Sequence, residues 1–466
     1  MLLTRSVRRA IVRTNPRRYA IFFSRFAHTH THTHSSSVVT TDPSYASIPR
    51  PAVIEKKQMF HFAWLSSRSL IRLTGPDVLP FLQGLMPANV TKFDPPSAVT
   101  RPIHTAFLNA QGRVLNDVFL WRGHQVAETG EHPWLIDVDA SSRGSLLAHL
   151  KKHKLRSKVK LESVSEEELR VYQGWVDEEN LAAKEGGKLD PEEDLHQGQT
   201  ERWSPSPAWT IDKGVTLSDP RPGMGMRWLG TAEGTAYDAL RRTPGFEKST
   251  IQDSNLVSED EYKVHRILHG IAEGQNEIIS GSALPQESNI DFFNGIDFRK
   301  GCYLGQELTI RTHHTGVVRK RILPVQLNKE YAPIPPNATG PTFVDDPGNP
   351  RNLEPYGNAG LPPRGSNISK VSSRGRSTGK WLGGIGNIGL ALCRLEMMTD
   401  IRLTDEPTQY DPDQEFKISW DAQEGYEAGE IKVKAFVPQW LRESINVSLK
   451  SRERKSTKDD EQAEVD

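Results

Sequence analysis

The sequence predicts an α+β protein with more than one domain. Helix-like and strand-like segments mix along the chain without the regular strand–helix–strand alternation that builds a parallel sheet. The length of 466 residues suggests two or three domains and is ample for a sizeable core. Although 36% of the residues are hydrophobic, no run approaches the roughly 20 apolar residues that a membrane-spanning helix needs.

Charge and cysteine content exclude several classes of protein. The 59 basic and 59 acidic residues give a formal net charge of zero, which does not fit a globally basic nucleic-acid-binding protein. Cys302 and Cys393 are the two cysteines of the chain. Two are too few for a disulfide-stapled secreted scaffold, or for a zinc or iron–sulfur site built from the cysteines of one chain.

Residues 1–50 are predicted to be a mitochondrial transit peptide and disordered leader, which places the protein in the mitochondrial matrix. Seven arginines and no acidic residue precede Asp42, and apolar residues interleave with the arginines, so a short helix would be amphipathic. A secretory signal fits poorly, because no uninterrupted apolar segment follows the arginines. The alternative is a basic, disordered tail.

Three helices are predicted from N-cap residues followed by apolar stripes. The first begins at Thr74, with Asp77 three residues later in a capping-box-like arrangement and a stripe at Val78, Phe81, Leu82 and Leu85. The second begins at Ser141 or Ser142 and buries leucines 146, 147 and 150. The third begins at Ser258, with Glu261 completing a capping box.

Strand-like runs divide the folded chain into two regions. Residues 51–320 form the predicted N-terminal region of two subdomains, with strands at 103–108, 114–121 and 134–138. Residues 321–445 form a smaller, predicted β-rich domain. Strand-like apolar runs at 317–327, 381–397 and 431–437 indicate its strands. Three other segments have few apolar residues, and we expect an acidic insertion at 177–207, a mobile insertion at 331–379 and a disordered tail at 446–466.

A basic run lies between residues 151 and 160, with Lys or Arg at six of these ten positions. One interpretation is a solvated helix end and strand face. The other is a rim that attracts an anion such as a phosphate or a polycarboxylate. The sequence alone leaves both open.

The residues best suited to chemistry surround Cys302. Arg299 and Lys300 precede this cysteine, and neighbouring cations favour thiolate over thiol. Gly301 and Gly305 allow the backbone to turn tightly. The thiolate could be a nucleophile, a metal or cluster ligand, or a redox group. Cys393 lies in an apolar strand-like run and is predicted to be a buried, inert side chain.

Residues 300–307 read K-G-C-Y-L-G-Q-E and match the K-G-C-[YF]-x-G-Q-E signature of the YgfZ-like family, which resembles the glycine-cleavage T-protein (GcvT), a folate-dependent aminomethyltransferase. Similar matches occur at 72–85, 107–113, 284–289 and 311–321, and the resemblance covers most of residues 60–445. The mitochondrial branch of this family consists of IBA-type iron–sulfur cluster assembly factors. The resemblance implies a GcvT/YgfZ-like multi-domain fold around a central folate-type cleft, with a C-terminal β-barrel-like domain.

By the same resemblance, the chain acts late in the maturation of mitochondrial [4Fe–4S] proteins, works with A-type iron–sulfur scaffold proteins and binds tetrahydrofolate. One reactive cysteine cannot fill the ligand sites of a cluster, so any cluster on Cys302 must be shared at an interface with a partner. The implied reactive group comprises Cys302, Lys300, Gln306 and Glu307. The implied cofactor-binding group comprises Asp117, Gly301, Tyr303 and Gly305.

The stretch that corresponds to the folate-activating acids of the T-protein departs from its pattern. Asn116 stands where the first acid is expected, and Asp117 matches the second. This change puts full aminomethyltransferase chemistry in doubt while leaving folate binding open. A folate-dependent aminomethyltransferase of the glycine cleavage type remains the alternative function, and whether the chain is a turnover enzyme stays uncertain at this stage.

Overall fold

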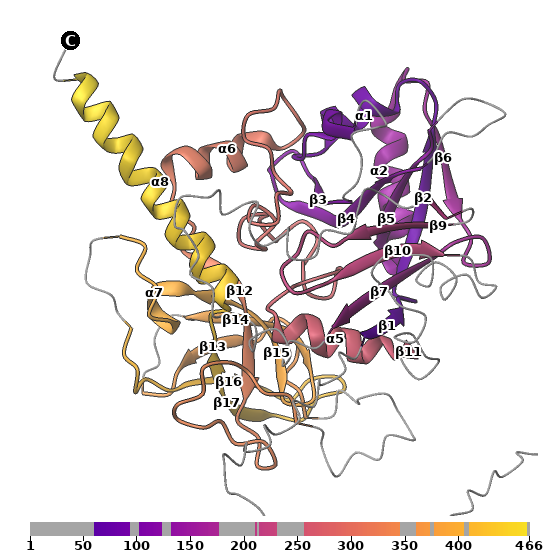
Figure 1. Cartoon of the computed structure of the whole chain (residues 1–466). Coiled ribbons are helices and arrows are strands. Elements are labelled where there is room, and N and C mark those ends of the chain that lie inside the picture. Colours follow the sequence, from indigo (N-terminus) through magenta and orange to yellow (C-terminus); the bar gives the residue numbers. More distant parts are fainter. Residues whose placement is uncertain are drawn as a thin grey trace, which may run out of the picture. The chain divides into compact units, whose positions relative to one another are not determined.

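The computed structural model describes residues 60–93, 102–123, 132–176, 210–211, 214–230, 256–344, 360–372, 377–404 and 410–463 (Figure 1). These residues belong to one compact unit, Lys56–Asp466. The expected leader at 1–50 and the expected acidic insertion at 177–207 lie outside the described residues. Within the described part, no helix is both long and apolar enough to cross a membrane.

A five-stranded sheet carries the first part of the N-terminal region. Its strand order is β3-β4-β5-β2-β6. Apolar side chains of helices α1 and α2 and of the sheet share one core. The elements are β2 (Arg68–Thr74), α1 (Val78–Leu85), the short helix η1 (Val90–Phe93), β3 (Ile103–Leu108), β4 (Val114–Arg122), β5 (Trp134–Asp139), η3 (Ala140–Ser142), α2 (Arg143–Lys154) and β6 (Lys160–Val164).

Helix α1 buries the predicted stripe, but it begins later than predicted. Its buried residues are Val78, Phe81, Leu82 and Leu85. The predicted start at Thr74 is wrong, because Thr74 ends strand β2 and Asp77 is the N-cap. Gly75, with a φ of +116°, lies between the two elements. This position requires glycine, because an added Cβ would lie 2.1 Å from the carbonyl oxygen of Lys158. The α2 prediction is confirmed, with Ser142 as N-cap.

A second, six-stranded sheet has the order β11-β1-β7-β10-β9-β8. Its strands are β1 (Phe60–Trp64), β7 (Arg170–Val176), β8 (Thr210–Ile211), β9 (Gly214–Ser218), β10 (Met226–Gly230) and β11 (Leu256–Val257). Helix α5 (Glu259–Leu268) begins as predicted, because the Ser258 side chain accepts a hydrogen bond from the Glu261 amide. A run of turns then leads to α6 (Gln306–Thr315).

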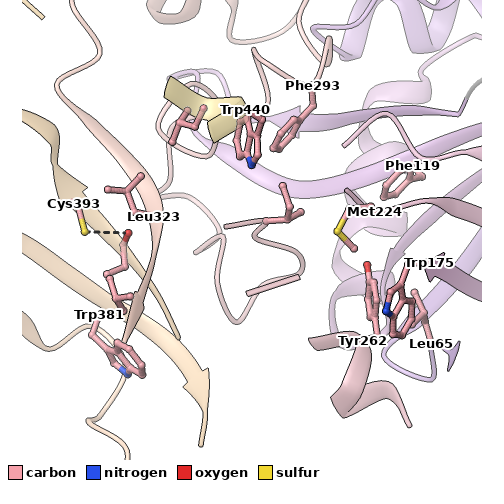
Figure 2. Close-up of a cluster of buried hydrophobic side chains, with 14 of the residues drawn as sticks. Leu65, Phe119, Trp175, Met224, Tyr262, Phe293, Leu323, Trp381, Cys393 and Trp440 are labelled. Atoms are coloured by element: carbon pink, nitrogen blue, oxygen red, sulfur yellow. Dashed lines mark hydrogen bonds between the residues drawn. The ribbon is translucent and has the colours of Figure 1, made fainter. Parts of the chain in front are cut away.

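The C-terminal domain is a closed six-stranded barrel with the order β12-β15-β14-β13-β16-β17. Its elements are β12 (Lys320–Leu327), β13 (Asn367–Lys370), β14 (Gly379–Ile385), β15 (Ile388–Arg394), α7 (Leu395–Met398), β16 (Phe416–Trp420) and β17 (Gly429–Ala435). Trp381, Leu323 and Cys393 are fully buried in its core (Figure 2). The predicted β-barrel-like domain is confirmed.

Two predictions about weakly apolar segments are wrong where the structure describes them. The expected insertion at 331–379 contains β13, which is a strand of the barrel. Ile368 is the residue of β13 that is buried in the barrel core. The expected disordered tail is helical through residue 463, because α8 (Gln439–Ala463) starts before it. Trp440 anchors this helix by donating a hydrogen bond from its ring nitrogen to the His269 carbonyl at 2.9 Å.

Candidate functional site

Cys302 lies on an irregular loop immediately before helix α6, and its side chain is exposed. The preceding residues are fixed by Asp297, whose carboxylate accepts from the Arg299 amide at 2.9 Å and from Lys92 at 3.0 Å. The Asp297 amide in turn donates to the Pro87 carbonyl at 2.9 Å. The thiol is therefore exposed to solvent on a loop whose preceding residues are fixed by hydrogen bonds and an ion pair.

Lys300 is the main anchor of this loop. Its ammonium group donates hydrogen bonds to the carbonyls of Gln83, Met86 and Ala88 at 2.7, 2.6 and 3.0 Å. These carbonyls lie at and just beyond the C-terminal end of α1, where the helix dipole favours a cation. An ammonium group has three N–H donors, and all three are used. Lys300 therefore has no donor left for a hydrogen bond to the Cys302 thiolate.

Burial lowers the pKa of Lys300 to about 8, although the nearby Asp297 carboxylate favours the charged form. The role predicted for Lys300, tuning the charge of the thiol, is limited to a through-space effect. Its hydrogen bonds give it a second role that the sequence did not indicate, which is to tie the loop to α1. The Leu304 amide strengthens the same attachment by donating to the Gly84 carbonyl at 3.0 Å.

Gly305 and Gly112 explain how the loop docks on the turn between β3 and β4. Both have positive φ, +80° and +77°, which suits glycine. A Cβ on Gly305 would lie 2.3 Å from the Asn109 oxygen, and one on Gly112 would lie 2.8 Å from the Gly305 oxygen. Gly301 differs, since an added Cβ would meet nothing within 4 Å. Packing among the residues that the structure describes does not require a glycine at 301.

The other predicted site residues of this segment differ in exposure: Gln306 and Tyr303 make contacts within the chain, whereas Glu307 faces solvent. The Gln306 side-chain oxygen accepts from the Tyr303 amide at 3.2 Å, so it closes the turn into α6. Tyr303 is 6% exposed, and burial raises the pKa of its hydroxyl to about 12. Glu307 is exposed, as are Arg311 and His314 on the same face of α6. This face belongs to the helix that follows the thiol loop, and its three side chains are exposed.

The second cysteine is buried, as predicted. Cys393 is fully buried in the barrel strand β15, and its sulfur lies 3.6 Å from the Ala391 oxygen. Burial raises the pKa of this thiol well above its usual value. Within the described residues, no group of three or more His, Cys, Asp or Glu side chains is placed to hold a metal ion.

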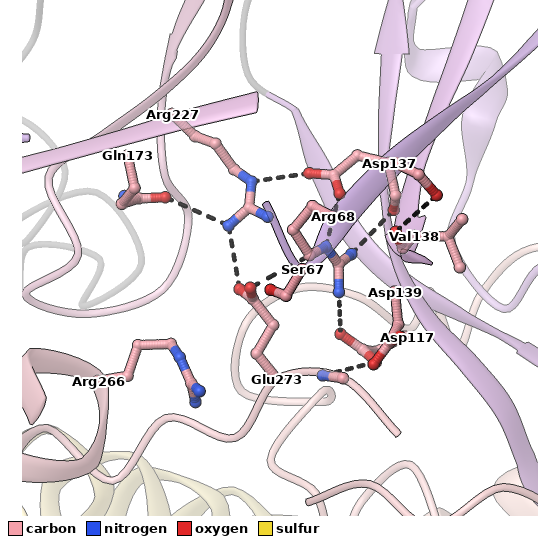
Figure 3. A network of polar contacts seen from close by, with 12 residues as sticks. Ser67, Arg68, Asp117, Asp137, Val138, Asp139, Gln173, Arg227, Arg266 and Glu273 are labelled. Carbon is pink, nitrogen blue, oxygen red and sulfur yellow. Dashed lines mark hydrogen bonds and ion pairs between the residues drawn. The ribbon is translucent and has the colours of Figure 1, made fainter. Parts of the chain in front are cut away.

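Asp117 lies apart from the thiol loop, inside strand β4. Its carboxylate is fully buried and accepts from the Arg68 guanidinium at 3.4 Å and from the Gly274 amide at 3.1 Å (Figure 3). Burial raises the pKa of Asp117, and Arg68 offsets part of this effect. Asp117 is the fourth residue of β4, which begins at Val114, so it lies roughly 10 Å along the strand from the β3–β4 turn on which the loop docks. The predicted site residues thus occupy two regions, not one.

Asp117 belongs to a buried charge network that the sequence analysis missed. We use this name for Arg68, Arg221, Arg227, Asp117, Asp137 and Glu273. Asp137 accepts from Arg68 at 2.6 Å and from Arg227 at 2.8 Å, and Glu273 accepts from Arg221 at 2.5 Å and Arg227 at 3.0 Å. The available signal was the presence of Asp137 and Asp139 in the otherwise apolar strand W-L-I-D-V-D.

Arg227 of this network and the neighbouring His104 have buried nitrogens with no hydrogen-bond partner among the described residues. They are Nη2 of Arg227 and the two ring nitrogens of His104. The His104 ring lies 4.9 Å from that of Phe119, and the Arg227 guanidinium lies 4.2 Å above the same ring. Burial lowers the pKa of His104 well below its usual value, so its ring is neutral. The region offers unpaired polar nitrogens against an aromatic face.

Comparison with known proteins places this architecture in a family. The barrel region, residues 319–443, matches the family described as CAF17, C-terminal beta-barrel domain. A relative from Aspergillus fumigatus, described as an iron-sulfur cluster assembly factor IBA57 homolog, mitochondrial, is 47% identical over 406 residues, with 84% of each chain covered. The chain belongs to the IBA57 family. A Neurospora crassa member with the same description is 42% identical over 398 residues, covering 84% of this chain and 83% of the relative.

The fold is that of the GcvT/YgfZ-like proteins, as predicted. Glycine cleavage system aminomethyltransferase T from Bartonella henselae superposes with a TM-score of 0.50 at 12% identity, over 83% of this chain and 87% of that one. At this identity the likeness concerns the fold alone. Membership of the IBA57 family supports a role in iron–sulfur cluster assembly and a mitochondrial location, both of which the sequence predicted.

Proposed function

We propose that this protein acts in the mitochondrial matrix, late in the maturation of [4Fe–4S] proteins, and that Cys302 supplies one thiolate to a cluster shared with an A-type scaffold protein. The observation that supports this most is the exposed thiol on an anchored loop. A cluster needs several thiolates, and Cys393 is fully buried in the barrel. The remaining ligands must therefore come from the partner.

The surroundings of Cys302 suit such a partner. Gly301 is exposed and leaves open space where a side chain would project, so a second backbone can approach the thiol closely. The exposed α6 face of Glu307, Arg311 and His314 offers both charge signs for recognition. Lys300, Gly305 and Gln306 hold the loop in place, which lowers the entropy that association costs.

The test is anaerobic spectroscopy of the full chain mixed with a cluster-loaded A-type scaffold protein. We expect a new visible absorption and circular dichroism signal that Cys302→Ser abolishes and that Cys393→Ala retains. Gly301→Val should weaken the complex without lowering the stability of the free protein, because an added Cβ meets no atom of the described residues within 4 Å. A signal that survives Cys302→Ser would refute the ligand role.

We further propose that a tetrahydrofolate-type ligand binds at the buried charge network. The donor set suits the edge of a pterin, because Asp117 offers a carboxylate while Arg227 and His104 offer unpaired nitrogens beside Phe119. Bound tetrahydrofolate would supply a carrier for one-carbon units. Arg68 and Gly274 each donate one hydrogen bond to Asp117, and a carboxylate has about four acceptor sites, so Asp117 keeps acceptor capacity for a ligand. Tyr303, Gly301 and Gly305 stay predictions as cofactor contacts.

Anaerobic calorimetric titration with tetrahydrofolate tests this second proposal separately. Asp117→Asn should weaken binding, whereas Cys302→Ser should leave it unchanged. If Cys302→Ser abolishes cluster maturation and Asp117→Asn does not, assembly work is the main function. The reverse result would favour the alternative, a folate-dependent aminomethyltransferase.

A further inference from the structure

The loop that follows helix α2 exposes a leucine in the middle of a cluster of cations. Leu155 is 87% exposed, the highest value among the large hydrophobic residues that the structure describes as exposed. Lys151, Lys152, Arg156 and Lys158 around it are exposed as well, and Lys154 is half-buried. We call these six residues the Leu155 surface. Between residues 140 and 161 the sequence has seven basic residues and no acidic one.

The leucine is held outward by the backbone. Leu155 has φ of 48° and ψ of −113°, a conformation that residues with a side chain rarely adopt. The loop on its C-terminal side is fixed by the Ser157 amide, which donates to the Lys154 carbonyl at 2.9 Å, and by the Lys158 amide, which donates to Asp77 at 2.6 Å. Val159 then returns to the core. The exposure of Leu155 is therefore built into the turn.

Few acids neutralise these cations. Lys160, at the edge of the Leu155 surface, pairs with Glu162 at 2.8 Å, and Asp77 is occupied by the Lys158 amide. Among the described residues, no ion pair engages the side chains of Lys151, Lys152, Lys154 or Arg156. Positive charge and an apolar residue are thus offered together on one protruding turn.

We propose that the Leu155 surface docks the protein on an anionic phospholipid membrane. An acidic protein partner would need a pocket for the leucine and fixed carboxylates, and long lysine side chains do not preset such a geometry. A fluid lipid surface requires neither, since its headgroups move to the cations while the leucine enters the acyl boundary. Charge complementarity therefore favours the lipid surface.

The position of this surface relative to Cys302 gives the docking a consequence. Asp77, the N-cap of α1, contacts the Leu155 surface through Lys158, and the carbonyls at the other end of α1 hold Lys300. The helix has eight residues, so it spans about 12 Å. Docking would hold the thiol loop within a short distance of the membrane. This proposal does not rest on the proposed cluster or folate chemistry.

The test is co-sedimentation of the full-length chain with phosphatidylcholine vesicles, with and without phosphatidylglycerol. The seven arginines that precede Asp42 are changed to Gln in every sample, because they would themselves bind anionic lipid. We expect binding only to the anionic vesicles. Lys152→Glu with Arg156→Glu should weaken it at least about 20-fold, as each basic residue near an anionic surface contributes about fivefold. The matched charge reversal Lys380→Glu with Lys450→Glu, at exposed sites elsewhere, should change it less than about twofold.

Leu155→Gly separates docking from folding. Glycine accepts the positive φ, so the unfolding midpoint should not fall, while loss of the apolar contact should weaken vesicle binding by about five- to tenfold. Equal loss in both charge-reversal variants would overturn the proposal. So would competition by millimolar inorganic phosphate, which would indicate a free-anion site. Leu155-dependent binding of polyglutamate without vesicle binding would overturn it in favour of an acidic protein partner.

Discussion

The Cys302 loop and the buried charge network differ in where their functional side chains lie. In the loop, the reactive side chain faces solvent, and Lys300 fixes the backbone by hydrogen bonds to carbonyls at the end of α1. In the network, the charged side chains are buried and each contacts at least one opposite charge. The difference separates two tasks within one chain. The loop can lose its functional atom without losing structure, whereas the loss of a charge from the network takes an ion-pair partner away from at least one other buried charge.

Arg227→Met should produce the largest loss of stability. It leaves Asp137 and Glu273 short of a buried partner, and breaking such pairs typically costs about 3–5 kcal/mol. Chemical denaturation measures the free energy of unfolding. The control is Arg442→Met, which removes an exposed pair with Asp400 and should cost less than about 1 kcal/mol. Equal costs for the two variants would show that the network is not stabilised by its pairing.

Lys300→Met should have an intermediate, local effect. Three carbonyls lose their donor, which costs about 1–2 kcal/mol and releases the loop from the end of α1. Hydrogen exchange should speed up at residues 299–306 and stay unchanged in the barrel. Lys92→Met is the matched control, because Lys92 is 70% exposed and contacts the same segment through Asp297. Unchanged exchange in Lys300→Met would mean that Gly305 packing alone holds the loop.

The two cysteines should separate function from stability. A thiol-alkylating reagent should modify Cys302 in the folded protein and reach Cys393 only after unfolding, which peptide mass spectrometry resolves. Cys302→Ser should change the free energy of unfolding by less than about 0.5 kcal/mol. Cys393→Ser buries a hydroxyl in the barrel core and should cost about 1–3 kcal/mol. Similar labelling rates for the two thiols would contradict the burial of Cys393.

Local patterns in the sequence were enough to predict most elements near the loop. The apolar stripe of α1, the Ser258 cap and strand β3 are set by neighbouring residues, so periodicity finds them. The network was missed because its partners are distant in sequence, as with Arg227 and Asp137, which are 90 residues apart. Strand β13 was missed because pairing with β14 and β16 stabilises a segment whose own residues are mostly polar.

The site itself was predicted only in part. The signature at 300–307 located the exposed thiol, but it gave no indication that Lys300 reaches back to α1, because that contact spans more than 200 residues. The resemblance to the T-protein suggested Asp117 as an acid that could contact a folate. Tertiary packing instead places Arg68 and Gly274 against it. Long-range pairing decides which polar residues stay open, and a single sequence does not contain that information.

The smallest predicted effect concerns pH, and it distinguishes two carboxylates within the network. Burial opposes ionisation of Glu273, but Arg227 and Arg221 outweigh it, so its pKa lies well below 4.5. Its stabilising contribution is therefore present above pH 4.5 and is lost as the pH falls through the folded pKa. For Asp117 burial dominates and the pKa lies above 3.8, so stability falls as the pH rises from 3.8 through the folded value.

Denaturation of Glu273→Gln and Asp117→Asn across acidic to neutral pH should show opposite trends. Relative to the unsubstituted protein, the penalty of Glu273→Gln should be largest at neutral pH and should shrink on acidification below 4.5. The penalty of Asp117→Asn should shrink as the pH rises, since asparagine does not titrate while the aspartate becomes a buried charge. Parallel trends would mean that Arg68 holds Asp117 ionised in the folded protein.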